Sequence, residues 1–397
     1  MKLMVWSAHP LSPTGYGTAM KNLLPYLQKE HEVFQFAYAG LGNHNEVWNG
    51  IPIFFNPDVG SPGATWLAHY DKKVKSDIIF SWFDLWISAY VGDTLSYDIA
   101  SKLVGYGIVD SVPLSPYNKM ILKTIWKVVP TCYWGKQVIE TAGIKCEEPI
   151  YHGVDTNVFQ PMDKMECRRK LGIPKDAWVY LFCGTNYDIR KNIPNTMLAF
   201  KLFLDRCPEA RKDAYLLLHT DPEGVDAGYD LLEMWVNTLG EKPGANIIFT
   251  KAEDYRIGIT DKQLAMRYNA SDVYVLCSLA EGFGFPPIEA ACCGIPSILT
   301  GWGPMKEVWE GKNFLVDPVD YFPTQKQLNW YCFPSTEGIS AQMEYTYFHR
   351  KEVAKMGKKA RKFALTLSWE NIGEQWLKLL RKVEWEKKYG TTRFFTP

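Results

Sequence analysis

Two glutamates lie on either side of a short loop that is suited to binding a ligand. Glu281 and Glu289 are separated by seven residues, and the stretch between them holds Gly282, Gly284 and a Pro-Pro pair. Glycine lets the backbone approach a ligand closely, and a helix start presents free N–H groups and the positive end of its dipole. Two carboxylates would repel an anion that touched them, so they are better suited to accept hydrogen bonds from hydroxyl groups. The spacing favours a ligand with phosphates and sugar hydroxyls, and a nucleotide sugar is the simple case.

The residues around this loop predict the elements that hold it. The run from Val273 to Cys277 is apolar, has the length of a strand and is rich in β-branched residues. Glu281 would then lie at the carboxyl side of a strand, where open α/β sheets bind ligands. A helix is expected to begin at about Pro287, with Glu289 in its first turn. A glutamate in a first turn is by itself more often a capping or solvated residue, so the functional interpretation depends on the glycines, prolines and glutamates together.

Another strand-to-loop transition carries two adjacent cations. A strand is predicted over residues 178–184, and Arg190 and Lys191 follow it. Arginine can bind a diphosphate bidentately, and lysine acts as a point charge. A solvated pair of charges in a surface loop is the usual alternative. Both residues are candidates for the phosphates of the same ligand.

The first half of the chain offers two weaker candidates. Gly15 and Gly17 lie between a predicted strand over residues 2–8 and a predicted helix. The pair either lets the backbone approach a phosphate or an acceptor, or forms an ordinary tight turn. Asp110 closes a further predicted strand, where polar side chains line the ligand-binding edge of a sheet. Its alternative role is to cap the turn that follows.

The loop with the two glutamates resembles the signature of a known family. Residues 281–290 read EGFGFPPIEA and residues 293–296 read CGIP, and a Gly-Trp-Gly triplet and Glu307 follow. This stretch is similar to EGFGxPxxEAxAxGxPV, the donor-binding motif of retaining GT-B glycosyltransferases of family four. In that family the first glutamate meets the sugar of the donor and the second meets its ribose hydroxyls. The resemblance implies these roles for Glu281 and Glu289.

The resemblance extends to the other candidates. The family has an arginine and a lysine for the donor pyrophosphate, normally several residues apart, and Lys191 matches the lysine well. Gly15 and Gly17 match a glycine pair that faces the cleft between the domains. Asp110 stands near a family histidine that serves sugar contact and acceptor chemistry. The donor-binding residues implied are Gly15, Gly17, Arg190, Lys191, Gly282, Phe283, Gly284 and Glu289, and the catalytic candidates are Glu281 and Asp110.

Alternating strands and helices predict an α/β fold with parallel sheets. Further strands are expected at 33–37, 78–82, 105–109, 128–132, 214–220 and 246–250. The resemblance implies the GT-B architecture, with two facing Rossmann-like domains and a cleft between them. The acceptor-side domain would span 1–155 and the donor domain 156–370, with a C-terminal helix, 371–397, packing back on the first domain.

Three other segments carry local expectations. Asp261 is expected to cap the helix that follows it. Residues 316–338 are aromatic and loop-like, and form either an insertion near the acceptor or packed surface. Lys119, Lys123 and Lys127 recur every four residues, which is typical of a membrane-surface helix or, more commonly, of a core helix with a solvated lysine face.

Composition limits the classes of function. The 397 residues are 47% hydrophobic, and the net charge is zero, with 44 basic and 44 acidic residues, which gives no general support for nucleic-acid binding. The nine cysteines are scattered and form no CxxC pair, which favours small buried residues in a reducing compartment. The N-terminus lacks the pattern of a signal peptide, and no apolar run approaches 18 residues. A cytoplasmic protein without a transmembrane span is expected.

The function expected from these features is sugar transfer from a nucleotide sugar, UDP- or GDP-linked, to an acceptor hydroxyl. The resemblance implies retention of the anomeric configuration. No D-x-D triplet occurs in the chain, so no metal and no further cofactor are expected, and the cations and helix dipoles would stabilise the diphosphate. A glycan or small molecule is the expected acceptor, with modified DNA and peripheral membrane contact left open. The alternatives are a binding or scaffold protein of the same fold, or an epimerase or phosphorylase.

Overall fold

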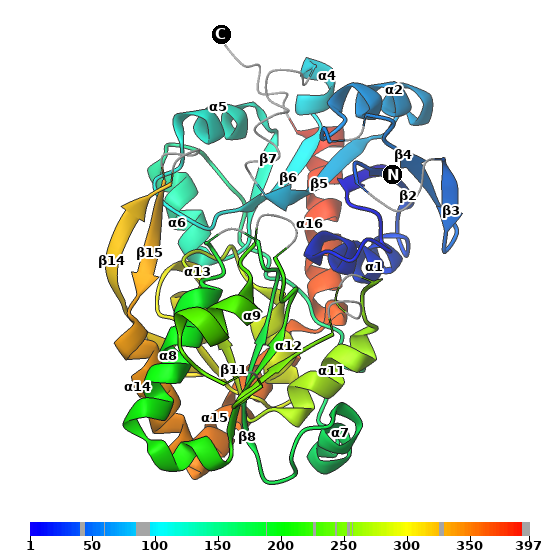
Figure 1. Cartoon of the computed structure of the whole chain (residues 1–397). Helices are drawn as coiled ribbons and strands as arrows, with labels where there is room; N and C mark the ends of the chain where they lie inside the picture. The colour runs from blue at the N-terminus through cyan, green and yellow to red at the C-terminus, as the bar shows by residue number, and fades with distance from the viewer. Residues whose placement is uncertain are drawn as a thin grey trace. The chain divides into compact units, whose positions relative to one another are not determined.

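The computed structural model describes residues 1–39, 44–58, 60–84, 96–187, 189–224, 228–242, 244–251, 255, 257–324 and 329–390 (Figure 1). The chain divides into two compact units. The first unit consists of Met1–Val109, Pro113–Gly153 and Leu367–Pro397, and the second of Asp110–Val112 and Val154–Thr366. The chain therefore enters the second unit for three residues before it returns to the first.

The first unit contains a seven-stranded sheet in the order β3-β4-β2-β1-β5-β6-β7. Its strands are β1 (Lys2–Ser7), β2 (Glu32–Ala37), β3 (Glu46–Trp48), β4 (Ile51–Phe55), β5 (Ile78–Asp84), β6 (Leu103–Ile108) and β7 (Lys127–Pro130). All pairs are parallel except β3 with β4. The central strands are almost continuously apolar and buried, as expected for a parallel sheet covered on both faces.

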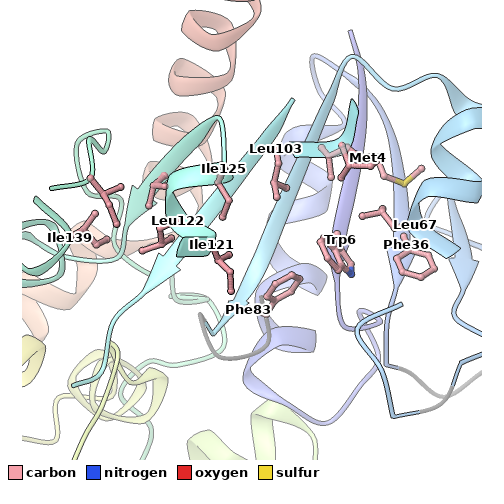
Figure 2. Close-up of a cluster of buried hydrophobic side chains, with 14 of the residues drawn as sticks. Met4, Trp6, Phe36, Leu67, Phe83, Leu103, Ile121, Leu122, Ile125 and Ile139 are labelled. Carbon is pink, nitrogen blue, oxygen red and sulfur yellow. The ribbon is translucent and has the colours of Figure 1, made fainter. Parts of the chain in front are cut away.

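The helices of the first unit pack around this sheet. They are α1 (Gly15–Leu27), α2 (Ala64–Val74), α4 (Tyr97–Ala100), α5 (Pro116–Thr124), α6 (Tyr133–Thr141) and α16 (Trp369–Tyr389). Figure 2 shows the hydrophobic core on one side of the sheet, where Trp6, Phe83 and Ile121 are almost completely buried. The expectation that three lysines share one helix is wrong, because α5 ends at Thr124 and Lys127 begins β7.

Helix α16 completes the first unit although it ends the chain. It begins at Trp369, two residues earlier than expected, because the Ser368 hydroxyl caps it by accepting from the Asn371 amide. Figure 1 shows α16 beside α1. A Cβ on Gly373 would lie 2.6 Å from Cγ of Tyr26 in α1, so glycine permits this close approach. The Trp376 ring lies 4.6 Å from that of Phe80.

The second unit contains a six-stranded parallel sheet in the order β10-β9-β8-β11-β12-β13. Its strands are β8 (Trp178–Cys183), β9 (Ala214–His219), β10 (Ile247–Phe249), β11 (Val273–Leu276), β12 (Ser297–Thr300) and β13 (Phe314–Val316). Its helices are α7 (Lys164–Leu171), α8 (Ile193–Arg206), α9 (Leu231–Glu233), α11 (Asp261–Ala270), α12 (Phe285–Cys292), α13 (Gly303–Trp309), α14 (Thr336–Phe348) and α15 (Arg350–Ala364), with short 3₁₀ or π turns at Pro208–Lys212, Met234–Thr238 and Leu365–Leu367.

Two local expectations are wrong. The segment expected to be loop-like forms an antiparallel hairpin, in which β14 (Pro318–Pro323) pairs with β15 (Trp330–Pro334). Thr260, and not Asp261, caps α11, because its hydroxyl accepts from the Gln263 amide while the Gln263 side chain accepts from the Thr260 amide.

Within the described part of the chain, no helix is long and apolar enough to cross a membrane. All nine cysteines are free thiols, and eight of them are buried.

Candidate functional site

The candidate site lies where the strand order of the second unit reverses. The chain runs from β8 outward through β9 to β10, and then crosses back to β11 on the other side of β8 before continuing to β12 and β13. The loops that leave the carboxyl ends of β8 and β11 therefore diverge from neighbouring strands, which is where open α/β sheets bind ligands. The first loop carries Arg190 and Lys191, and the second carries Glu281.

Three charged side chains meet at this point. The Lys191 ammonium lies 2.6 Å from Oε1 of Glu281, and Nη1 of Arg190 lies 3.4 Å from the same oxygen. The side chains of Glu281 and Lys191 are only 8% and 15% exposed, whereas that of Arg190 is 32% exposed. Two cations and one anion leave the cluster with one net positive charge, so it is suited to receive an anionic ligand.

Hydrogen bonds to the backbone hold the two loops together. Nη1 of Arg190 donates to the Ala280 carbonyl over 3.0 Å, and the Leu279 amide donates to the Arg190 carbonyl over 2.8 Å. Nδ2 of Asn192 donates to the Cys277 carbonyl over 3.0 Å. Asn192 itself has a φ of 55°, in the left-handed region that asparagine tolerates better than most residues. The charged groups are therefore positioned by a fixed pair of loops.

Burial and charge shift the pKa values of this cluster in the same direction. Burial raises the pKa of the Glu281 carboxyl, but the Lys191 ammonium and the Arg190 guanidinium outweigh it, so the net pKa lies below the usual value. Burial lowers the pKa of Lys191, and the Arg190 charge lowers it further, so that the Glu281 carboxylate offsets only part of the shift.

The loop after Glu281 turns sharply into α12. Gly284 has a φ of 82°, which favours glycine, and it precedes the first helical residue, Phe285. Phe283 is almost completely buried, so its ring packs in the core and does not face a ligand. Pro286 and Pro287 lack N–H groups, so the first turn of α12 offers fewer amide donors than an ordinary helix start. An anion here would depend on the cations and on the amides from 282 to 285.

Glu289 lies one turn further into α12 than expected. Because the helix begins at Phe285, Glu289 belongs to its second turn. Its side chain is buried, and its Oε2 accepts a hydrogen bond of 2.8 Å from the Tyr268 hydroxyl of α11. Burial and the Glu289 charge hold the pKa of Tyr268 well above its usual value, so the phenol remains a donor. No pattern in the sequence identifies Tyr268 as a site residue, because nothing in the spacing of α11 and α12 indicates this contact.

The remaining candidates lie elsewhere. Asp110 belongs to the short segment of the second unit, and its Oδ1 accepts from the Ser111 hydroxyl over 2.7 Å. Gly15 and Gly17 lie in the first unit, within the first turn of α1 and not in a loop, because the Thr14 side chain caps the helix. A Cβ on Gly17 would lie 2.1 Å from the Ser12 carbonyl oxygen, so close packing alone requires glycine there.

Among the described residues, no group of three or more histidine, cysteine, aspartate or glutamate side chains could hold a metal ion.

The sequence matches known proteins over the part that carries the glutamates. Residues 242–331 match the family described as glycosyl transferases group 1. D-inositol 3-phosphate glycosyltransferase 2 of Catenulispora acidiphila is 30% identical over 177 residues, which cover 43% of this chain and 39% of that protein. A D-inositol 3-phosphate glycosyltransferase of a Nocardioides species is 26% identical over 246 residues, which cover 60% of this chain and 49% of that protein. The chain thus spans less than half the length of these relatives.

Solved structures match over nearly the whole chain. Sucrose-phosphate synthase of Thermosynechococcus elongatus superposes with a TM-score of 0.76 at 18% identity, covering 96% of this chain and 99% of that one. The Anabaena protein HepE, solved in complex with UDP-glucose, gives a TM-score of 0.70 at 17% identity, with 96% and 100% covered. The fold is therefore the expected GT-B fold. The family match, over residues 242–331, confirms the resemblance of the motif to glycosyl transferases of group 1.

Proposed function

We propose that the protein transfers a sugar from a nucleotide-sugar donor to an acceptor hydroxyl, with retention and without a metal. The observation that carries this proposal is the cluster of Arg190, Lys191 and Glu281 at the point where the strand order reverses. The second unit binds the donor and the first unit serves the acceptor. The similarity to D-inositol 3-phosphate glycosyltransferases and the shared motif support this assignment.

Each charged group of the cluster has a role in the proposed reaction. Lys191 has three N–H donors, of which one reaches Glu281, so it can also bind a phosphate oxygen. Arg190, the most exposed of the three, binds the second phosphate. Glu281 accepts a hydrogen bond from a hydroxyl of the transferred sugar. Glu289, which the Tyr268 hydroxyl orients, accepts hydrogen bonds from the ribose hydroxyls. The two cations stabilise the negative charge that develops on the departing diphosphate.

Transfer on one face of the sugar fits these groups. The bond between the anomeric carbon and the phosphate oxygen breaks, and the bond to the acceptor oxygen forms on the same face. The acceptor proton passes to the departing phosphate oxygen, so no protein base is needed. Asp110 contacts the sugar or the acceptor in this scheme.

A uridine donor is the first choice. HepE was solved with UDP-glucose, and the E. coli trehalose-6-phosphate protein with UDP-2-fluoro glucose. The curated relatives are named for transfer to D-inositol 3-phosphate, which makes a small phosphate-bearing polyol or sugar the first acceptor to examine. We propose that the reaction takes place in the cytoplasm and needs no further cofactor.

The test is thermal stability against UDP-, GDP-, ADP-, CMP- and dTDP-sugars, with nucleotide release assayed in the same wells. A ligand that binds only the folded protein stabilises it by about 2.7 kcal/mol at a hundred times its Kd. One stabilising donor with slow release supports the transferase. A stabilising donor without release, even with acceptors present, supports a binding protein. Interconversion of the sugar without acceptor indicates an epimerase, and a requirement for inorganic phosphate indicates a phosphorylase.

A further inference from the structure

The β14–β15 hairpin is attached to the loop that carries Glu281. The Cys332 amide of β15 donates to the Leu279 carbonyl over 3.1 Å, and the Cys332 thiol lies 3.1 Å from the same oxygen. The Leu279 amide in turn donates to the Arg190 carbonyl. Strand β15 therefore continues the hydrogen bonding that holds the two loops of the charged cluster.

The other end of β15 is attached to the segment that carries Asp110. The Trp330 amide donates to the Val112 carbonyl over 2.7 Å, and the two residues form an isolated antiparallel bridge. This bridge accounts for the grouping of 110–112 with the second unit, apart from the chain on either side. One short strand thus makes backbone hydrogen bonds close to both candidate catalytic carboxylates. Its contact with Leu279 is two residues from Glu281, and its contact with Val112 is two residues from Asp110.

A chain of side-chain hydrogen bonds leads from the hairpin to the Asp110 carboxylate. The Thr324 hydroxyl donates to Oδ1 of Asn329, Nδ2 of Asn329 donates to the Ser111 hydroxyl over 2.5 Å, and the Ser111 hydroxyl donates to Oδ1 of Asp110 over 2.7 Å. The direction is fixed, because an amide oxygen and a carboxylate can only accept. The Ser111 hydroxyl both accepts and donates, so its two hydrogen bonds strengthen each other cooperatively.

The hydrogen-bonded side chains of Ser111 and Asn329 are buried, so each would destabilise the fold if it lost its hydrogen-bond partner. Ser111 is 3% exposed and Asn329 is 5% exposed, and an unpaired polar group at such a position would cost about 1–3 kcal/mol. The backbone bridge alone already closes the hairpin onto 110–112. The hydrogen bonds through Thr324, Asn329 and Ser111 end on one oxygen of the Asp110 carboxylate, so their additional effect is to orient that carboxylate.

We propose that Ser111, Asn329 and Thr324 are positioning residues that orient Asp110 for the transfer reaction, with β15 holding Asp110 and Glu281 on one framework. This inference rests on the proposed function. The hairpin (gold in Figure 1) would then be part of the catalytic apparatus and not packed surface. Misplacement of a reacting group by about 1 Å can reduce turnover about 100-fold, so loss of one bond in the chain should affect turnover more than donor binding.

The test compares variants of the full chain in which one hydrogen bond is removed. Ser111→Ala removes the donor to Asp110, and Thr324→Val removes the first donor with little change of shape, whereas Thr324→Ser retains the hydroxyl. Val319→Thr, at a 66% exposed position of β14, is the matched control. UDP release from UDP-glucose is measured with water and with D-inositol 3-phosphate as acceptors, and the Kd for UDP by calorimetry.

We expect Ser111→Ala to lower kcat about 10- to 100-fold and Thr324→Val to lower it severalfold, with the Kd for UDP within about twofold. Thr324→Ser and Val319→Thr should behave as the wild type. Unchanged kcat in Ser111→Ala, or unchanged kcat in Asp110→Asn, would overturn the inference but would leave the proposed transferase function intact. Equal losses of kcat and UDP affinity would also overturn it, because they indicate a general structural role. A wild-type protein that neither binds UDP nor releases it from UDP-glucose contradicts the uridine-linked function and the inference with it.

Discussion

Lys191 and Glu281 are 90 residues apart in the chain, and Nζ of the first lies 2.6 Å from Oε1 of the second. The family resemblance implies that both residues bind the donor, the lysine its diphosphate and the glutamate its sugar. The structure shows that they also bind each other. A ligand must therefore share Lys191 with Glu281, and the pair holds the site charged and ordered before the ligand arrives.

Lys191→Ala should weaken donor binding by about 10- to 100-fold, because it removes a charge-assisted hydrogen bond worth about 1.5–3 kcal/mol. The measurement is the Kd for UDP by calorimetry. Lys201→Ala is the control, since Lys201 makes a 2.5 Å ion pair with Asp205 on α8 and is not part of the cluster. Equal affinities for UDP in wild type and Lys191→Ala would remove Lys191 from the site.

Donor binding should weaken at alkaline pH because Lys191 loses its proton. The pKa of Lys191 lies below its usual value, which is about 10.4. Its ammonium, which attracts the diphosphate, is therefore lost at a lower pH than that of an exposed lysine. We expect the Kd for UDP to rise before pH 10.4, and Lys191→Arg to move this rise to higher pH. The same alkaline rise in Lys191→Arg would contradict the assignment.

Glu281→Gln should lower turnover by two orders of magnitude or more, since a carboxylate aimed at the transferred sugar is replaced by a neutral amide. The protein should stay folded, although Lys191 and Arg190 lose their shared partner. The pKa of Glu281 lies below its usual value of about 4.3, so its protonation should not limit the wild type above that pH. Initial rates of nucleotide release and a melting curve check both statements.

Tyr268→Phe should raise the KM for the donor more than it lowers kcat, because Glu289 loses the donor that orients it. Tyr347→Phe is a matched control: its hydroxyl donates to Asp213 over 2.6 Å, just before the amino end of β9. Both variants lose a hydrogen bond to a carboxylate, at a cost in stability of about 1–3 kcal/mol. A rise in KM of similar size in the two variants would indicate a structural role for Tyr268.

Stability should fall as the pH decreases below about 6.5. Burial lowers the pKa of His152 to about 3, and that of His219 to about 3, whereas an unfolded histidine titrates near 6.5. Between these two pKa values the unfolded chain binds more protons than the folded protein. Each histidine therefore lowers the free energy of unfolding by about 1.4 kcal/mol for each unit by which the pH falls. The free energy of unfolding is measured in urea at several pH values between about 3 and about 6.5. His152→Leu should lower the number of protons taken up on unfolding by about one, and an unchanged dependence on pH would refute the role of His152.

Much of the fold follows from local patterns in the sequence. Buried parallel strands such as β1, β5 and β8 are mostly apolar runs. Helix α12 follows from the glycines before it and the prolines in its first turn. Capping hydroxyls shifted the boundaries: Thr14 places Gly15 and Gly17 inside α1, and Thr260 takes the position expected for Asp261. Such shifts depend on which of two neighbouring polar side chains reaches an amide.

The long-range features could not be predicted. The hairpin strands read PVDYFP and WYCFP, and prolines and aromatics obscure the alternation that identifies a strand. The contact of Tyr268 with Glu289 and the chain from Thr324 to Asp110 depend on how distant segments pack. The family resemblance places a base-binding loop at 251–260 and gives no role to the acidic loop at 221–228. Residues 225–227, 252–254 and 256 of these loops lie outside the described residues.

Helix α16 has a consequence for how this protein emerges from the ribosome. Most domains fold as units, the N-terminal one first, while synthesis continues. Here the first unit lacks Trp369 and Trp376 until the whole second unit has been translated, and Phe80 and Trp82 lack aromatic partners that bury them. The second unit, whose residues after 153 are contiguous, can fold ahead of it. The first unit should therefore mature after the second, and its strand β5 should expose Phe80 and Trp82 until α16 has been synthesised.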